Sequence, residues 1–379
     1  MRVLQICNDF AGSKVHCNLF RALDTLGVEQ IVYCPVRDEK LLLLNSFEGR
    51  YVGFVYSCCI KAWYKFVYHY KLYRLFKDMS SKIDMQQIDY IHAHTLFSDG
   101  GLAYLAKKKY GIGYSVAVRN TDYNLFVRFL KHTHLYGRKI LLHADKVYFI
   151  SKGIKDGFVR SSFAQPLLEQ MLNKLFVQPN GIDEYWCHNI SRTSPNGHSI
   201  LYIGDFSKNK NVERLIQAVL HLSKEDKYKD IRLILVGGGT KRGDRDATES
   251  ITQLINENTG IIQYKGKIFD KDQLRKVMSS CALFAMPSIH ETFGLVYVEA
   301  LSQNLPVIYT KGQGIDGMFD NHVGVGVNPY FVNEIEMAIT AIFDNYTYYG
   351  NEGIDFNGFD WNVIAARYKN DYEMGVSAM

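Results

Sequence analysis

The sequence lacks the cysteine patterns that define disulfide-rich and zinc-binding domains. Its 379 residues include 7 cysteines, an odd number, and no CxxC pair occurs. Disulfide frameworks need an even set of cysteines, and zinc knuckles need closely spaced ones. The sequence therefore predicts a protein of a reducing compartment, with no disulfide framework and no metal site.

Linkers, membrane spans and targeting segments are also missing. Only 7 prolines are present, no low-complexity tract or short repeat occurs, and the first residues, MRVLQICNDF, lead directly into a strand-like run. No apolar run reaches the ~20 residues that span a membrane. We therefore expect a cytoplasmic protein of two or three domains, neither membrane-spanning nor secreted through a signal peptide.

Charge divides the chain into two parts. Residues 1–178 contain 25 Lys and Arg against 14 Asp and Glu, a balance of +11, whereas residues 179–379 contain 19 against 25, a balance of −6. The turn-forming sequence QPNGID at 178–183 lies where the sign changes. This pattern predicts an N-terminal domain at 1–178, a second domain at 179–355 and a C-terminal segment at 356–379.

Short apolar runs alternate with helix-like stretches in both parts. The runs are rich in Val, Ile, Tyr and Phe and alternate little, which is typical of strands buried on both faces. Strands are predicted at 3–7, 30–34, 90–93, 115–118, 147–150, 175–177, 200–203, 233–236, 283–286 and 307–309. Helices are predicted at 15–26, 100–109, 126–142, 211–222, 248–258, 271–280 and 295–302. The alternation indicates an α/β fold of two Rossmann-like domains that face each other across a cleft.

The most informative stretch runs from Pro287 to Tyr309. A buried strand leads to a loop with Glu291, and a helix opens at Leu295. Free N–H groups and the helix dipole make such a start a site for a diphosphate, and Gly294 lets a ligand approach the backbone. Glu291 and Glu299 can both face that ligand, because a carboxylate accepts two hydrogen bonds from a diol. The alternative is a structural helix with solvated glutamates.

This stretch resembles the signature of the family 4 retaining glycosyltransferases of the GT-B fold, which include bacterial polysaccharide and phosphatidylinositol mannosyltransferases. The family pattern E-x-F-G-L-x-x-x-E-A stands here as ETFGLVYVEA at residues 291–300. The following G-x-P-V-I segment stands as NLPVI, with Asn304 in the glycine position, and Asn also tolerates positive φ. The resemblance covers nearly the whole chain and is strongest between residues 200 and 325.

The resemblance implies a role for each part of the signature. Glu291 is expected to contact the transferred sugar, and Glu299 to bind the ribose of the nucleotide. The C-terminal helix, within 356–379, is expected to cross back to the N-terminal domain. The backbone that lies against the sugar and the diphosphate maps to Phe293, Gly294 and Leu295.

A second stretch, YIGDFSKNKNV at residues 202–212, has a strand, a loop with Gly204 and two lysines, and a helix start. It is a candidate phosphate cradle or a solvated basic turn. It is similar to the family's G-R-x-x-x-x-K-G loop, whose Arg and Lys neutralise the donor diphosphate. Lys210 matches the lysine, but Asp205 stands in the arginine position and brings a negative charge. Lys208 is a candidate to compensate.

Two further glycine turns are secondary candidates. Gly237 and Gly239 follow a strand where the family has a Gly-x-Gly turn beside the nucleotide. Gly12, in NDFAGS at 8–13, matches part of a family loop that approaches the donor phosphates and the acceptor. Neither stretch has the GxGxxG spacing of a dinucleotide site, which argues against a nicotinamide-dependent oxidoreductase.

Two strand ends in the first half carry polar residues. Arg119 stands where many family members have a histidine that binds the donor sugar, so it is a candidate phosphate or sugar contact. The alternative is a surface arginine paired with Asp122.

His92 and His94 have the spacing of a metal pair, but no third ligand is evident from the sequence. A cleft wall or a hydrogen-bonded structural role is therefore expected for them.

The stretch 64–82 is basic and aromatic. Such a segment can lie on an anionic membrane surface, or it can be a packed helix with a solvated basic face. Together with the charge of residues 1–178, it favours a membrane-associated or anionic acceptor. No nucleic-acid-binding motif occurs.

Taken with the resemblance, these features predict a metal-independent retaining glycosyltransferase with no cofactor. It would move a sugar from a nucleoside diphosphate sugar to a hydroxyl of a glycan or lipid-linked acceptor in cell-surface polysaccharide synthesis. We expect it in the cytoplasm, with peripheral contact to the inner face of the plasma membrane through 64–82. The alternative is a catalytically impaired sugar-nucleotide-binding protein of the same fold, since Asp205 and Arg119 depart from the family pattern.

Overall fold

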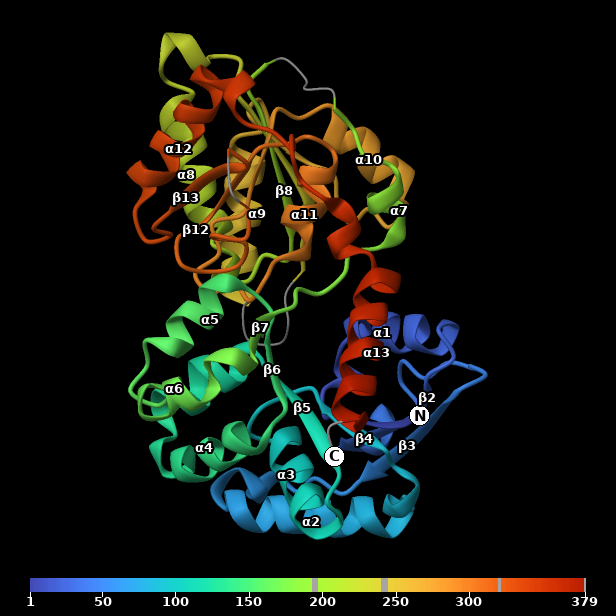
Figure 1. The fold of residues 1–379 in the computed structure, drawn as a ribbon. Coiled ribbons are helices and arrows are strands. Elements are labelled where there is room, and N and C mark those ends of the chain that lie inside the picture. Colours follow the sequence, from blue (N-terminus) through green and yellow to red (C-terminus); the bar gives the residue numbers. More distant parts are fainter. Residues whose placement is uncertain (193–196, 240–244, 320–321, 378–379) are drawn as a thin grey trace. The chain divides into compact units, whose positions relative to one another are not determined.

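The computed structural model describes residues 1–192, 197–239, 245–319 and 322–377. These residues form two compact units, one of residues 1–181 with 358–379 and one of residues 182–357 (Figure 1). Each unit contains its own parallel β-sheet with helices packed on both faces. The boundaries between the units lie after Gly181 and after Asn357. The sequence predicted these boundaries after residues 178 and 355.

The first unit is built on a seven-stranded parallel sheet, in the order β3-β2-β1-β4-β5-β6-β7. Its strands are β1 (Arg2–Ile6), β2 (Glu29–Val36), β3 (Val52–Cys58), β4 (Tyr90–Ala93), β5 (Gly113–Val118), β6 (Lys146–Phe149) and β7 (Leu175–Val177). The sequence missed β3. This strand lies at the edge of the sheet and is mostly half-exposed, so it lacks the continuous buried run that marks the central strands.

The helices of the first unit are α1 (Lys14–Thr25), α2 (Tyr68–Lys82), α3 (Asp99–Tyr110), α4 (His134–His143), α5 (Lys152–Val159), α6 (Leu168–Met171) and α13 (Trp361–Ser377). The single helix predicted at 126–142 is wrong. A π-helical segment, Asp122–Val127, and a 3-10 turn, Lys131–Thr133, precede α4. The chain leaves the helical conformation at Leu130, where φ is −94° and ψ is 58°.

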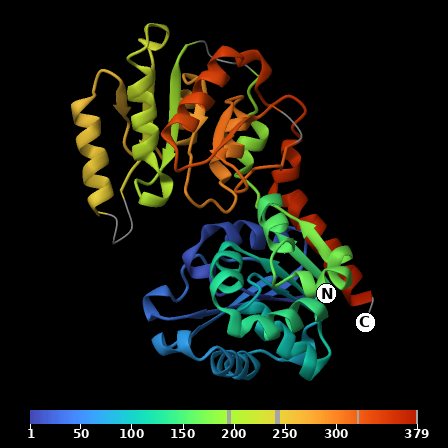
Figure 2. The same ribbon diagram turned by 90° about the vertical axis from the view of Figure 1, so that its left-hand side faces the viewer.

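The C-terminal helix α13, red in Figure 2, belongs to the first unit and packs against α1 (Figure 1). Its residues Ile364, Ala365, Tyr368 and Tyr372 are buried in the same core as residues of β1 and β2. The Tyr372 hydroxyl lies 2.8 Å from His92 Nδ1 of β4, so a specific polar contact accompanies the apolar packing.

The second unit is built on a six-stranded parallel sheet, in the order β10-β9-β8-β11-β12-β13. Its strands are β8 (Ser199–Gly204), β9 (Arg232–Gly237), β10 (Ile262–Tyr264), β11 (Leu283–Ala285), β12 (Val307–Thr310) and β13 (Gly324–Val327). Its helices are α7 (Glu184–His188), α8 (Val212–Leu222), α9 (Arg245–Glu257), α10 (Lys271–Ser279), α11 (Leu295–Ser302) and α12 (Val332–Asp344). The predicted alternation is confirmed, although the edge strands β10 and β13 and the helix α12 were missed.

Within the described residues, every helix is too short or too polar to cross a membrane. The sequence predicted a basic helix at 64–82, and the structure has a 3-10 turn, Ala62–Phe66, followed by α2. The buried face of α2 consists of Tyr68, Leu72, Leu75 and Met79. The helix is therefore a packed element of the first unit, whose other face is exposed.

Candidate functional site

The turn between β11 and α11 has the geometry of an anion site. Gly294 precedes the helix with φ 76°, and no side chain of the described residues caps the helix start. A Cβ at Gly294 would lie 2.5 Å from the ring of Tyr297 and 3.2 Å from Glu291 Cγ. The open N–H groups of the first turn carry a partial positive charge, so an anion can bind there. Phe293 is buried, whereas Gly294 and Leu295 remain partly exposed.

Glu291 is fixed by several hydrogen bonds at this turn. Its Oε1 accepts from the backbone N–H of Thr292 at 3.1 Å, and its Oε2 accepts from Ser288 Oγ at 3.3 Å. Its own N–H donates to Gln313 Oε1 at 2.9 Å. Gln313 and Ser288 were not singled out in the sequence, because their roles depend on the fold alone.

Lys210 completes this group. Its Nζ lies 2.7 Å from Glu291 Oε2, and both side chains are largely buried. Asn209 connects the loop after β8 to the loop after β11. Its Nδ2 donates to the backbone carbonyl oxygen of His290 at 2.9 Å, and its own backbone carbonyl oxygen accepts from the Ile289 N–H at 2.7 Å. Asn211 Nδ2 donates to the carbonyl oxygens of Pro287 and Pro329.

Asp205, the departure from the family pattern, has a local structural role. Its Oδ1 accepts a hydrogen bond from the Ser207 N–H at 2.9 Å, so the side chain stabilises the turn after β8. Lys208, the candidate to compensate for the missing arginine, is exposed. In this loop, Lys210 therefore contacts Glu291, whereas the Asp205 carboxylate accepts a hydrogen bond from the backbone of the loop itself.

The glycine turns at the ends of β8 and β9 are in contact. Gly204 pairs with Gly237 in register, and the Gly238 N–H donates to the Gly204 carbonyl oxygen at 2.9 Å. Gly237 has φ 114°, and a Cβ there would lie 2.1 Å from that oxygen. Gly239 also has positive φ, with Lys267 Nζ 3.5 Å from where its Cβ would be. The ends of β8 and β9 can approach this closely only because Gly237 has no side chain.

Glu299 lies in the second half of α11 and is partly exposed. Desolvation by the surrounding residues raises the pKa of its carboxyl to about 7, and Asp183 adds to this increase, whereas Lys271 opposes it. Lys271 Nζ is paired with Asp183 Oδ2 at 2.6 Å. Glu299 therefore keeps its proton to a higher pH than an ordinary carboxyl group does. Asn304, beyond the helix, has φ 60°, as its replacement of a glycine predicts.

The first unit contains two of the predicted site residues, Arg119 and Gly12. Arg119 Nε donates to the carbonyl oxygen of His94 at 3.3 Å, and its Nη1 donates to Asn180 Oδ1 at 3.2 Å. Its backbone N–H, rather than its guanidinium, donates to Asp122 Oδ2 at 2.9 Å. Gly12 ends the 3-10 turn that follows β1.

His92 and His94 are buried in the first unit, and each makes a hydrogen bond. His92 Nδ1 contacts Tyr372 and Ser115, and His94 Nε2 contacts Gln5 Oε1 at 3.0 Å. The structure also places Cys7 and His16 beside His94, which the sequence spacing does not reveal.

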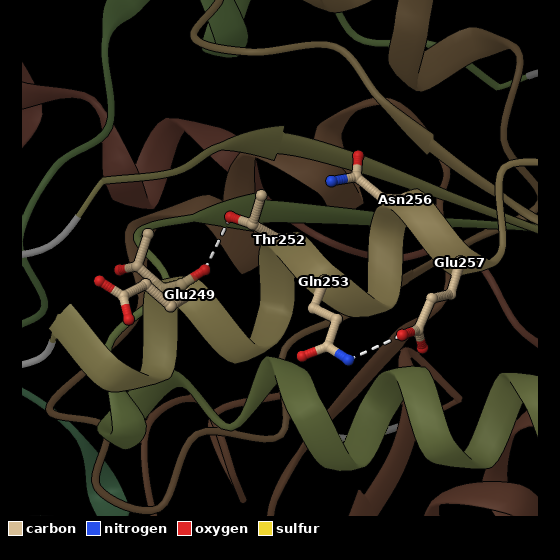
Figure 3. Close-up of a pocket in the computed structure, with 6 residues that line it drawn as sticks. Glu249, Thr252, Gln253, Asn256 and Glu257 are labelled. Carbon is tan, nitrogen blue, oxygen red and sulfur yellow. Dashed lines mark hydrogen bonds between the residues drawn. The ribbon is translucent and has the colours of Figure 1, made fainter.

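A separate hollow on the second unit is lined by one face of α9 (Figure 3). The lining side chains are polar, and two hydrogen bonds within the helix connect some of them. None of the predicted site residues belongs to this hollow, so it is not the candidate donor site. The lining residues are Thr248, Glu249, Thr252, Gln253, Asn256 and Glu257.

Two units, each with a parallel sheet covered by helices, are the architecture of the GT-B glycosyltransferases. Family comparison agrees with this class. Residues 12–185 match the model of glycosyltransferase family 4, and residues 188–352 match the model of glycosyl transferases group 1. Together the two models match most of the chain, which therefore belongs to the family 4 glycosyltransferases.

Individual relatives agree on family and fold. The chain is 24% identical to alpha-monoglucosyldiacylglycerol synthase of Acholeplasma laidlawii over 85% of this chain and 81% of that protein. Sucrose-phosphate synthase of Thermosynechococcus elongatus is similar in structure, with a TM-score of 0.73, 17% identity and complete coverage of both chains. HepE of Anabaena, solved with UDP and glucose, has a TM-score of 0.67 and 18% identity, covering 99% and 100%.

Proposed function

We propose that this protein transfers a sugar from a nucleoside diphosphate sugar to a hydroxyl of a glycan or lipid-linked acceptor, with retention of the anomeric configuration. The observation that carries the proposal is the Lys210–Glu291 pair at the uncapped start of α11. A cation and a helix N-terminus can together stabilise the charge that develops on a departing diphosphate. Glu291, held beside them, is then positioned to contact the sugar.

The transfer step needs no metal in this proposal, because Lys210 and the helix start supply the positive field. In the transfer, the bond between the anomeric carbon and the diphosphate oxygen breaks, and a bond to the acceptor oxygen forms. The acceptor proton passes to the leaving diphosphate. Glu299 accepts hydrogen bonds from the ribose diol, and the glycine edge of Gly204, Gly237 and Gly239 lies beside the nucleotide.

The proposed donor rests on the similarity to HepE, whose structure contains UDP and glucose. The test is a transfer assay with UDP-, GDP- and ADP-linked sugars, in which the released nucleotide is measured and the product anomer is assigned by NMR. We expect turnover with one nucleotide class and a product anomer that matches the donor. An inverted product, or no release with any donor, would contradict the proposal.

A lipid-linked acceptor is supported by the relative named for the synthesis of alpha-monoglucosyldiacylglycerol. It is also supported by an exposed aromatic surface around α2, where Trp63 is 49%, Phe66 76% and Tyr73 57% exposed. Such side chains next to basic residues can insert into the headgroup region of an anionic membrane. We propose that this surface brings the first unit to the inner leaflet of the plasma membrane, where cell-surface polysaccharides are assembled.

Vesicle sedimentation tests the membrane contact. Trp63→Ser combined with Tyr73→Ser should lower binding to anionic vesicles severalfold, and neutral vesicles should bind weakly in every case. Tyr330, 55% exposed on the second unit, provides a matched control as Tyr330→Ser. Equal loss in the control and the double variant would show that the surface around α2 is not the contact.

One observation favours a second candidate, a sugar-nucleotide-binding protein with impaired catalysis. Asp205 occupies a position that is arginine in the family pattern, and its carboxylate is engaged with the Ser207 backbone. Donor binding without measurable transfer or hydrolysis, across the same donor panel, would support this candidate over the enzyme.

A further inference from the structure

A second group of chemically versatile side chains lies in the first unit, at the carboxyl ends of β1 and β4. Cys7 follows β1, His94 follows β4, and His16 lies in the first turn of α1. Each offers one ligand atom, and these atoms all lie within 4.8 Å of one another. All three side chains are buried, with relative exposures of 0%, 1% and 8%, respectively.

A chain of hydrogen bonds sets the tautomer of His94. Gln30 Nε2 donates to the carbonyl oxygen of Phe20 at 3.0 Å, which leaves Gln30 Oε1 as the acceptor for Gln5 Nε2 at 3.5 Å. Gln5 Oε1 then faces His94 Nε2 at 3.0 Å. Because an amide oxygen only accepts, His94 Nε2 carries the proton and His94 Nδ1 keeps its lone pair.

That lone pair is left unused by the described residues. His94 Nδ1 is buried and has no hydrogen-bond partner among them. Buried polar atoms are normally satisfied, so an orphaned acceptor on a side chain of this group requires an explanation. A metal ion supplies one. A histidine whose other nitrogen donates to an oxygen is also the usual arrangement around a bound metal.

We propose that Cys7 Sγ, His94 Nδ1 and a ring nitrogen of His16 bind one soft divalent cation of the Zn²⁺ class. Thiolate and imidazole are the ligands that this class prefers, with bonds of about 2.3 Å to sulfur and about 2.0 Å to nitrogen. On binding, the S–H bond of Cys7 breaks, a sulfur–metal bond forms, and the proton leaves to solvent.

Burial raises the pKa of the Cys7 thiol, the carboxyls of Asp99 and Asp9 add to this increase, and the guanidinium of Arg119 opposes it. A bound ion would connect α1 to the ends of two central strands, β1 and β4. None of the three ligands belongs to the transfer machinery proposed above.

Metal analysis of the full-length protein tests the proposal. The protein is stripped with a chelator, dialysed against Zn²⁺ or Co²⁺, and freed of excess metal, and the bound metal is measured by elemental analysis. We expect one ion per chain, a higher melting temperature than for the stripped protein, and a thiolate-to-Co²⁺ charge-transfer band. Cys7→Ser should remove that band, and His94→Gln should lower the metal content at least tenfold.

Cys34→Ser is the matched control, because Cys34 is equally buried on the neighbouring strand β2 but lies outside the group. It should retain the ion and the band. If the ligand variants fail to fold, X-ray absorption of the Zn²⁺-loaded wild type decides, with one sulfur and two imidazole ligands expected. Wild-type protein without bound metal, a sulfur-free coordination shell, or an unchanged band in folded Cys7→Ser would each overturn the proposal.

Discussion

Lys210 and Glu291 form an ion pair with 2.7 Å between Nζ and Oε2, although they are 81 positions apart in the chain. The pair joins the loop after β8 to the loop after β11, so it brings the two motifs to the same edge of the sheet. It also holds the cation next to the open start of α11. A diphosphate that binds there would take over part of the interaction that Lys210 makes with Glu291 in this structure.

Replacing Lys210 by alanine should lower both catalysis and stability. Loss of a preorganised cation at the leaving group is expected to lower kcat by about 100-fold or more. The free energy of unfolding should fall by about 1–3 kcal/mol, because the variant leaves the largely buried Glu291 without its cation, although Glu291 keeps its hydrogen bonds from Ser288 and Thr292. Steady-state kinetics and a thermal melt of the same preparation measure both effects.

The control for this variant is Lys227→Ala, because Lys227 is also paired with a carboxylate, Asp344, but lies on the outer surface of the second unit. It should leave kcat unchanged. A similar loss of kcat in both variants would mean that the Lys210 effect is not local to the leaving group.

Glu299 should make donor binding depend on pH. Its pKa is raised to about 7, chiefly by desolvation, so the carboxylate that accepts hydrogen bonds from a ribose diol forms only as the pH rises through that value. Nucleotide affinity is expected to increase up to about tenfold between pH 6 and pH 8, since one pKa unit corresponds to a factor of ten. Calorimetric titrations with UDP at the two pH values measure this change in affinity. In Glu299→Gln the part of the pH dependence that is due to Glu299 should vanish, and only the part that is due to titration of the nucleotide should remain.

In the ligand-free protein, the contribution of Glu299 to the free energy of unfolding should fall as the pH rises, opposite to its contribution to donor binding. The folded state holds the Glu299 proton above the ordinary carboxyl pKa, so this group stabilises the fold at low pH and loses that contribution as the pH rises toward 7. Glu299→Gln should therefore become more stable relative to the wild type as the pH is raised from 5 to 8. A difference that does not change with pH would contradict the raised pKa.

The sequence predicted best the features whose pattern lies within a short stretch of the chain. The bounds of α11 were predicted correctly, because the strand, the glycine and the apolar helix are adjacent in the chain. The edge strand β3 was missed because half-exposed residues do not form a buried run. The motif predicted the roles of Glu291 and Lys210, but not that they touch. The position of Cys7 beside His94 requires the pairing of β1 with β4, which no local pattern encodes.

Asp205→Asn should strengthen donor binding. Asparagine keeps an oxygen that accepts from the Ser207 N–H and removes the negative charge, so the turn is preserved while repulsion of the diphosphate falls. The gain is expected to be on the order of 1 kcal/mol or less for a solvent-screened charge. Asp205→Ala, which loses both the charge and the hydrogen bond, should melt at a lower temperature than Asp205→Asn. Weaker UDP binding by Asp205→Asn would show that the carboxylate has a direct role in binding.

Gly237→Ala should remove donor binding by distorting the sheet edge. The residue has φ 114°, and the new Cβ would lie 2.1 Å from the carbonyl oxygen of Gly204, so the ends of β8 and β9 must separate. The backbone strain alone costs about 1–2 kcal/mol. Gly260→Ala is the control, because a Cβ there meets nothing within 4 Å. Melting temperature and UDP affinity should both fall in Gly237→Ala and stay unchanged in the control.

Tyr372→Phe tests how α13 is held on the first unit. The variant keeps the buried ring and removes only the hydroxyl that lies 2.8 Å from His92 Nδ1. A single buried hydrogen bond contributes about 1 kcal/mol, and His92 retains its contact with Ser115, so the loss should not exceed that value. In a unit of this size the melting temperature should fall by about 2–4 °C. Tyr348→Phe, with an exposed tyrosine of the second unit, should melt like the wild type. A loss of several kcal/mol in Tyr372→Phe would instead mean that the hydroxyl anchors the helix through a wider network that includes His92 and His94.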